Sequence, residues 1–218
     1  MAVVPTEQEA RVLLPGVSWS TYEAILADVD APGTRLTYDR GDLEIMSPSD
    51  EHERFKRLIG RMIEALTEEL EIPIRSSGST TFKSEPKRRG FEPDESYYLA
   101  NEPRIRGRDE IDLSVDPPPD LVVEVEITRG VIDRMPIYAA LGVPEVWRYD
   151  GATLRVEQLQ ADGTYAPTER SAALPMVTLA DMQRFLDERN STDETSWIRS
   201  FRAVVRAWRE RPSGSAAG

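Results

Sequence analysis

The feature that most constrains the fold is an apolar run at residues 119–128 (Pro-Asp-Leu-Val-Val-Glu-Val-Glu-Ile-Thr), which carries acids only at alternate positions. Neighbouring side chains of a β-strand point to opposite faces, so one face is apolar and the other presents Asp120, Glu124 and Glu126. Strand geometry separates Glu124 and Glu126 by about 7 Å at Cα. Acids this close need a cation, a shared proton or open solvent. The run therefore predicts either a divalent metal site or an edge strand with a solvated acidic face.

The composition limits which metal such a site could hold. The chain has 218 residues, no cysteine and one histidine, which is enough for one domain with a real hydrophobic core. Without cysteine, thiolate chemistry and disulfides are excluded, and a single histidine excludes a multi-histidine centre. Any metal must then be held by oxygen, which favours Mg²⁺ or Mn²⁺.

The charge distribution bears on nucleic-acid binding. A net charge of −12 argues against a protein that coats nucleic acid through bulk electrostatics. Residues 75–108 nevertheless contain eight basic and five acidic side chains. This stretch is compatible with a local binding groove and equally with a solvated turn.

No part of the sequence predicts a membrane segment. The longest apolar runs are too short to span a bilayer, and the first ten residues lack the basic region and apolar core of a signal peptide. We expect a cytoplasmic protein with no membrane partner.

Periodicity predicts the order of the elements. Helical spacing is expected over 19–29, then a β-hairpin over 36–47, then a long helix over 50–70 whose start has a capping-box pattern at Asp50 and Glu53. Short extended pieces over 72–99 and a charged loop over 100–118 lead to the apolar strand. A strand–helix–strand crossover over 120–149, a hairpin over 152–168 and helices over 179–189 and 193–211 follow. We expect one domain over 1–190, a C-terminal helix over 191–211 packed on it or on a dimer partner, and a disordered tail over 212–218.

Two acidic segments predict a shared site. Asp94 follows Pro93 in an extended piece, and Glu124 and Glu126 lie thirty residues later. If the two strands are neighbours, their acids converge on one point, as a magnesium ion used for phosphodiester hydrolysis requires. Because removal of Asp94 or Glu124 relieves the repulsion between the carboxylates, we expect either loss to abolish metal-dependent activity while sparing or even raising stability.

The order of these segments resembles the PD-(D/E)xK nuclease superfamily and, within it, the Uma2 family of predicted restriction endonucleases. The matching segments are residues 45–49 (Ile-Met-Ser-Pro-Ser) leading to His52, residues 92–94 (Glu-Pro-Asp), residues 119–125 and residues 142–147 (Gly-Val-Pro-Glu-Val-Trp). The resemblance covers roughly residues 15–185. It implies an α/β fold of the α+β type, with a restriction-endonuclease-like mixed β-sheet flanked by helices, an N-terminal hairpin and C-terminal helices. It also implies a homodimer that acts on DNA.

The resemblance assigns Asp94 and Glu124 as metal ligands. The superfamily has lysine two positions after the second acid, where this chain has Glu126, so Glu126 is a candidate base or third ligand. Uma2-like sequences often place the lysine four residues before a tyrosine, and here Arg134 stands four before Tyr138. Arginine can stabilise a charged phosphate but cannot readily act as a base.

Three further residues are weaker candidates. His52, in the first turn of the long helix, is more often a surface or capping residue than a catalytic one. Lys83 would supply the positive charge if Arg134 does not, and Asp120 shares the acidic face of the apolar strand. Tyr97 and Tyr98 are expected to pack in the core rather than stack on bases.

The sequence therefore predicts a Mg²⁺-dependent endonuclease that cleaves DNA, with Asp94, Glu124, Glu126 and Arg134 in its active site. The alternative is a catalytically silent nuclease-like fold that binds nucleic acid or another protein. It is supported by the missing lysine and by the net charge of −12. A hydrolase of smaller phosphoesters is a third interpretation.

Overall fold

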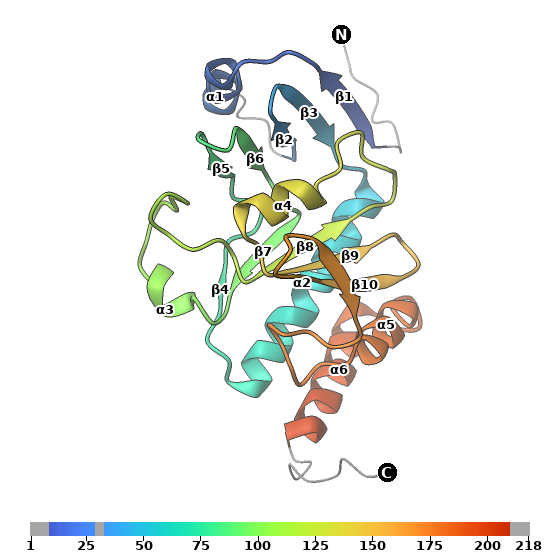
Figure 1. The fold of residues 1–218 in the computed structure, drawn as a ribbon. Coiled ribbons are helices and arrows are strands. Elements are labelled where there is room, and N and C mark those ends of the chain that lie inside the picture. The colour runs from blue at the N-terminus through green and yellow to red at the C-terminus, as the bar shows by residue number, and fades with distance from the viewer. Residues whose placement is uncertain (1–8, 29–32, 210–218) are drawn as a thin grey trace.

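The computed structural model describes residues 9–28 and 33–209, which form two sheets and six helices (Figure 1). The strands are β1 (Ala10–Leu14), β2 (Arg35–Asp39), β3 (Asp42–Ser47), β4 (Arg75–Ser76), β5 (Phe82–Ser84), β6 (Arg89–Phe91), β7 (Glu95–Tyr98), β8 (Leu121–Val125), β9 (Glu145–Tyr149), β10 (Leu154–Leu159) and β11 (Tyr165–Thr168). The helices are α1 (Trp19–Asp28), α2 (Asp50–Leu70), α3 (Glu102–Ile105), α4 (Met135–Leu141), α5 (Leu179–Asp187) and α6 (Glu194–Arg209). Within these residues, no helix combines the length and the apolar character needed to cross a membrane.

The apolar run forms β8, in the middle of a six-stranded sheet of order β11-β10-β9-β8-β7-β4. It pairs antiparallel with β7 and parallel with β9, and α4 connects β8 to β9. The mixed sheet and the predicted crossover are thus confirmed. All five residues of β8 are buried, so the interpretation as a solvated edge strand is wrong.

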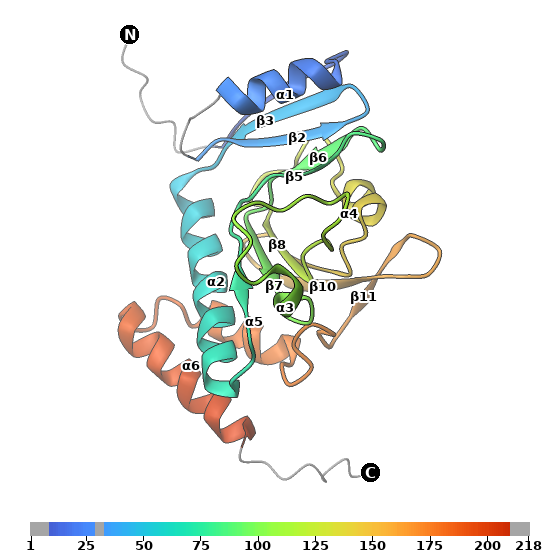
Figure 2. The same ribbon diagram turned by 90° about the vertical axis from the view of Figure 1, so that its left-hand side faces the viewer.

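Helices cover both faces of this sheet. Leu121, Val123 and Val125 belong to the large core cluster, which also contains apolar residues of α2, α5 and α6. Val122 faces the other way, into a smaller cluster with Ile137 and Tyr138 of α4. Helix α2 runs along the six-stranded sheet, and α6 packs against α2 (Figure 2). The acidic positions of β8 therefore face the side that α4 covers.

The N-terminal sheet has the order β1-β3-β2-β6-β5. The predicted hairpin is formed by β2 and β3, and its turn places Arg40 and Gly41 at positive φ, which glycine adopts without strain. Helix α1 covers the sheet, with Tyr22 stacked on Tyr38. Strand β1 was not expected, and it adds an edge that pairs with β3.

Several predicted boundaries shift by a few residues. Helix α2 is capped by Ser49, whose hydroxyl accepts from the His52 amide at 3.2 Å, and not by the capping box expected at Asp50 and Glu53. The short helix α3 interrupts the predicted loop over 100–118. The expected tail over 212–218 lies outside the described residues, and the division at residue 190 remains a prediction.

Candidate active site

Asp94 and Glu124 come together where the neighbouring strands β7 and β8 meet, as the sequence predicted. Asp94 immediately precedes β7 and is fully buried, while Glu124 lies near the end of β8 and is 3% exposed. One Asp94 oxygen, Oδ2, accepts from the backbone N–H of Val125 at 2.7 Å. This bond fixes the Asp94 carboxylate beside the end of β8, where Glu124 is.

His52 reaches the same point from the first turn of α2. Its Nε2 donates to Asp94 Oδ1 at 2.7 Å, and its Nδ1 faces Glu9. A ring that donates from both nitrogens must be doubly protonated. Burial alone would lower the pKa of His52, but the bonds to Asp94 and Glu9 raise it to about 9. The expectation of a surface or simple capping histidine is wrong, because the side chain is completely buried.

The histidine also determines the charge of its two partners. Burial, the largest single effect, tends to raise the pKa of Asp94, but the hydrogen bond and charge of His52, the charge of Arg134 and the Val125 N–H together hold the pKa below its usual value. Burial likewise opposes ionisation of Glu9, whose pKa the contact with His52 lowers to about 2. Both acids are thus anions beside a cationic imidazole.

Glu124 is held by two residues of the segment that follows β8. Arg134, directly before α4, donates from Nη1 to Glu124 Oε2 at 2.6 Å, and the Tyr138 hydroxyl donates to Oε1. Burial nevertheless raises the pKa of Glu124 to about 7, although Arg134 opposes the shift. The buried Glu124 side chain thus binds a proton more readily than a free glutamate does.

Three residues of the N-terminal sheet region complete the site. Arg11 of β1 donates to Glu9 Oε2 at 3.2 Å and to Glu44 Oε1 at 2.7 Å. Glu44 of β3 is fully buried, and its Oε1 lies 3.9 Å from Nη2 of Arg134. Contacts thus connect seven ionisable residues in series, an arrangement called here the ionic chain: Asp94, His52, Glu9, Arg11, Glu44, Arg134 and Glu124.

A pocket of about 300 Å³ opens beside Glu124. Glu126 also lines it, with its carboxylate bound by Arg148 through two hydrogen bonds of 2.8 and 2.9 Å. Four arginines contribute to its wall: Arg11, Arg129, Arg134 and Arg148. The wall also carries three acids, Glu124, Glu126 and Asp133, so the arginines outnumber the acids by one. Guanidinium donors bind an anionic group such as a phosphate.

Two of the weaker candidates lie elsewhere. Asp120, at the opposite end of β8, accepts from the backbone N–H groups of Leu99 and Asn101 at 2.7 and 2.9 Å, so it stabilises a loop. Lys83 of β5 pairs with Glu23 of α1 at 3.0 Å. Neither residue lines the pocket beside Glu124.

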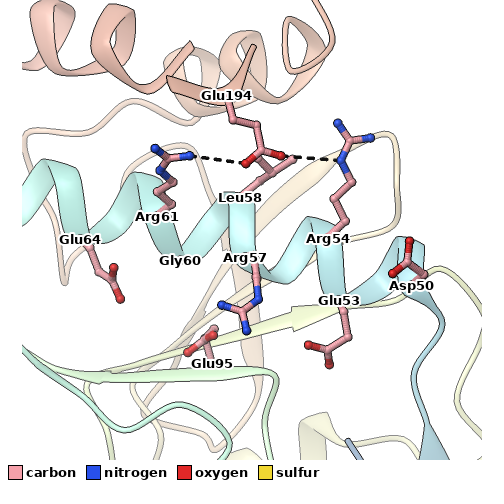
Figure 3. A pocket seen from close by; sticks show the side chains of 10 residues that line it. All are labelled: Asp50, Glu53, Arg54, Arg57, Leu58, Gly60, Arg61, Glu64, Glu95 and Glu194. Carbon is pink, nitrogen blue, oxygen red and sulfur yellow. Dashed lines mark hydrogen bonds and ion pairs between the residues drawn. The ribbon is translucent and has the colours of Figure 1, made fainter. Parts of the chain in front are cut away.

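Another pocket, of about 690 Å³, lies along α2 (Figure 3). Glu194 of α6 lies between Arg54 and Arg61 there and pairs with both, at 4.0 and 3.4 Å. Glu124 does not line this pocket, whereas it lines the smaller one. We therefore take the pocket beside Glu124 as the candidate active site.

The sequence reasoning did not identify Glu9, Arg11, Glu44 or Arg148. The available signal was Glu44, an acid between two apolar residues of a predicted strand. The expectation that removing Asp94 would relieve repulsion also changes. Asp94 accepts from His52 and Val125, so its loss would leave a buried cation and a buried N–H unpaired, which destabilises a protein.

Comparisons with known proteins agree with this fold. The Uma2 family model, described as "Putative restriction endonuclease", matches residues 19–186. No curated protein matches the sequence. A solved structure titled as a putative nuclease belonging to DUF820, from Anabaena variabilis ATCC 29413, superposes with a TM-score of 0.50 and 13% identity. The match covers 75% of this chain and 97% of that one. Since the family model spans well over half of its residues, the chain belongs to the Uma2 family.

Proposed function

We propose that this protein is an endonuclease that hydrolyses phosphodiester bonds in DNA at the pocket beside Glu124. Family and fold together indicate a nuclease-type hydrolase. The observation that carries the proposal is the ionic chain, whose Glu124 end lines a pocket with four arginines in its wall. Its other end, Asp94, is hydrogen-bonded to the backbone of Val125, which also lines that pocket. Such a pocket can receive a phosphate beside groups able to handle a proton or a metal.

The ionic chain also supports Mg²⁺ or Mn²⁺ as the cofactor. Acids and cations alternate along it, but its two ends, Asp94 and Glu124, are both acids and raise each other's electrostatic cost. A divalent cation between these ends would remove that cost. Among the described residues, no three His, Asp or Glu side chains form a preformed metal cage. Two carboxylates suffice for Mg²⁺, which usually keeps several waters and shares substrate phosphates.

In this proposal Asp94 and Glu124 hold the ion, with Glu126 as a third ligand or as the base that takes a proton from water. The bound ion would polarise the phosphoryl oxygen and lower the pKa of water. Arg134 neutralises charge that develops on the phosphate, since its guanidinium is always protonated. Arg148 holds the Glu126 carboxylate at the pocket wall, and Arg129 adds a further cation there.

One observation favours the alternative, a silent nuclease-like fold that binds nucleic acid or a protein. Both oxygens of Asp94 and both oxygens of Glu124 already have donors within the protein. In the silent fold these bonds are the permanent state of the site. In the enzyme at least the contacts of Glu124 rearrange when the cation binds.

Cleavage of plasmid and single-stranded DNA at low salt, with Mg²⁺ or Mn²⁺ and with EDTA, separates the two functions. We expect EDTA and Asp94→Asn to abolish cleavage. Asp120→Asn is the matched control, because Asp120 is a buried acid at the other end of the same strand. Equal cleavage by wild type and Asp94→Asn would move the active site elsewhere.

Thermal melts with and without the metals test binding independently of turnover. A cation that binds only the folded protein must raise its Tm. No cleavage together with an unchanged Tm would favour the silent fold. The homodimer implied by the family resemblance is part of this proposal, and sedimentation equilibrium would test it.

A further inference from the structure

Three ionisable residues reach the candidate active site from the N-terminal sheet or from the residue directly before it. Glu9 precedes β1, Arg11 belongs to β1 and Glu44 belongs to β3. Glu9 and Arg11 also precede residue 19, where the family match begins. The catalytic strands β7 and β8 do not need these residues in order to pair. Their presence therefore calls for an explanation beyond sheet formation.

Because the side chains of these three residues are largely buried, their charges contribute little net stability to the fold. The side chains of Glu9 and Glu44 are at most 1% exposed, and that of Arg11 is 11% exposed. Moving charged side chains out of water costs nearly as much free energy as the attraction between them provides. Apolar side chains of similar size often stabilise a fold equally well. Buried charged residues that contact an active site are better explained by a role in holding its side chains in position.

Glu9 and Glu44 contact different parts of the candidate active site. Glu9 accepts from Nδ1 of His52, which orients the ring so that Nε2–H points to Asp94. A carboxylate that fixes an imidazole in this way also fixes the group on its other side. Glu44 accepts from the backbone N–H groups of Val131 and Ile132 at 2.6 and 3.0 Å, and so holds the loop that carries Arg134.

Arg11 joins the two ends, since it binds Glu9 and Glu44 at once. We propose that Glu9, Arg11 and Glu44 are positioning residues that jointly set the orientation of Asp94 and of the Arg134–Glu124 pair. The N-terminal sheet is then a working part of the nuclease centre. This inference rests on the proposed function for its kinetic consequence, but its geometric consequence can be tested without DNA.

The kinetic test compares wild type with Arg11→Met, Arg11→Lys and Glu44→Gln. Misplaced supporting groups typically cost about 10- to 100-fold in activity or metal affinity. We expect Arg11→Met and Glu44→Gln to lower kcat by about tenfold or more, with KM for DNA changed less than kcat. Arg11→Lys should recover much of the loss, because a lysine restores one of the two contacts. Circular dichroism identifies variants that do not fold. If Arg11→Met does not fold, the comparison uses Arg11→Lys and Glu44→Gln.

The matched control is Glu145→Gln. Glu145 is also a buried acid, 1% exposed, but it accepts from Trp147, Ser171 and Ala172 and has no contact with the ionic chain. Its loss should lower stability and leave kcat of the folded protein near the wild-type value. An equal fall of kcat in Glu145→Gln would mean that any buried acid has this effect, and would overturn the proposal.

The geometric test uses His52, which is the only histidine in the chain. Its imidazole therefore gives a single set of NMR signals. We expect Arg11→Met and Glu44→Gln to shift these signals although neither residue touches His52, and Glu145→Gln to leave them in place. Unchanged signals together with wild-type kcat in Arg11→Met would overturn the proposal. If the wild type cleaves no DNA, the proposed function fails, and the His52 signals alone decide whether the three residues position the site.

Discussion

At the scale of single residues, Arg134 is the group whose role is most sharply testable. It pairs with Glu124 at 2.6 Å and stands where the family often has lysine. We expect Arg134→Met to lose on the order of 100-fold in the rate of DNA cleavage, the usual effect of removing one preorganised contact to the transition state. Arg134→Lys should keep substantial activity, because a lysine supplies the charge although it cannot also reach Glu44. Single-turnover cleavage measures both, and equal rates for wild type and the Met variant would make Arg134 a structural residue.

Glu9 makes a separate prediction about acid stability. Its pKa is about 2 in the folded protein against 4.5 for a free glutamate. As the pH falls, the unfolded chain therefore binds this proton first. The stabilisation by Glu9 is complete above about pH 4.5 and is lost as the pH falls towards 2. Urea unfolding across this range should show a shallower loss of stability for Glu9→Gln than for wild type, and parallel curves would contradict the assignment.

His52 stabilises the protein over the opposite range of pH. Its pKa is raised from 6.5 to about 9, so its contribution to stability is complete below pH 6.5 and is lost as the pH rises through 9.

The buried charges of the site were only partly predictable from the sequence. Asp94 and Glu124 were recognisable because strand alternation and family motifs single them out. Glu9 and Arg11 were not, because in a chain of 39 acids and 27 bases only the folded structure shows which ones are buried together.

At the scale of elements, the start of α2 bears directly on the site because His52 lies in its first turn. The Ser49 hydroxyl caps this turn through the His52 amide. We expect Ser49→Ala to destabilise the protein by about 1 kcal/mol, the usual cost of losing an N-cap, as measured by urea unfolding. Glu53→Gln should have a smaller effect, because Glu53 does not cap the helix. A larger effect at Glu53 would restore the capping box that the sequence suggested.

The elements that sequence reasoning identified are those with a strong period. The seven apolar positions along α2 fit only a helix, and the alternation in the run that forms β8 fits only a strand. Strand β1 was missed for a physical reason. Four of its five residues are exposed and it pairs on one side only, so burial imposes no alternating pattern on its sequence. Yet β1 carries Arg11, which shows that a weakly patterned element can still contribute to a site.

At the scale of the whole molecule, the net charge of −12 must be reconciled with DNA as the proposed substrate. Several basic side chains of the stretch over residues 75–108 already have partners within the protein. Arg75 donates to backbone carbonyls, Arg89 pairs with Asp39, and Arg106 pairs with Glu102. We propose that DNA is contacted chiefly by the arginines at the pocket beside Glu124. Among them Arg129 forms no ion pair or hydrogen bond with any residue that the structure describes.

This arrangement predicts weak dependence of DNA binding on salt. Each phosphate that a protein neutralises contributes about 0.9 to the slope of log K against log salt concentration for duplex DNA. With at most four arginines at the pocket, the slope should not exceed about 4 in magnitude. Fluorescence anisotropy with the Asp94→Asn variant and no divalent metal measures binding without cleavage. Arg129→Gln should reduce the slope by about 1, while Arg57→Gln, which removes an exposed arginine from the pocket along α2, should leave it unchanged. A slope near 8 would require a phosphate-binding surface much larger than this pocket, and the DNA would then lie across another face of the protein.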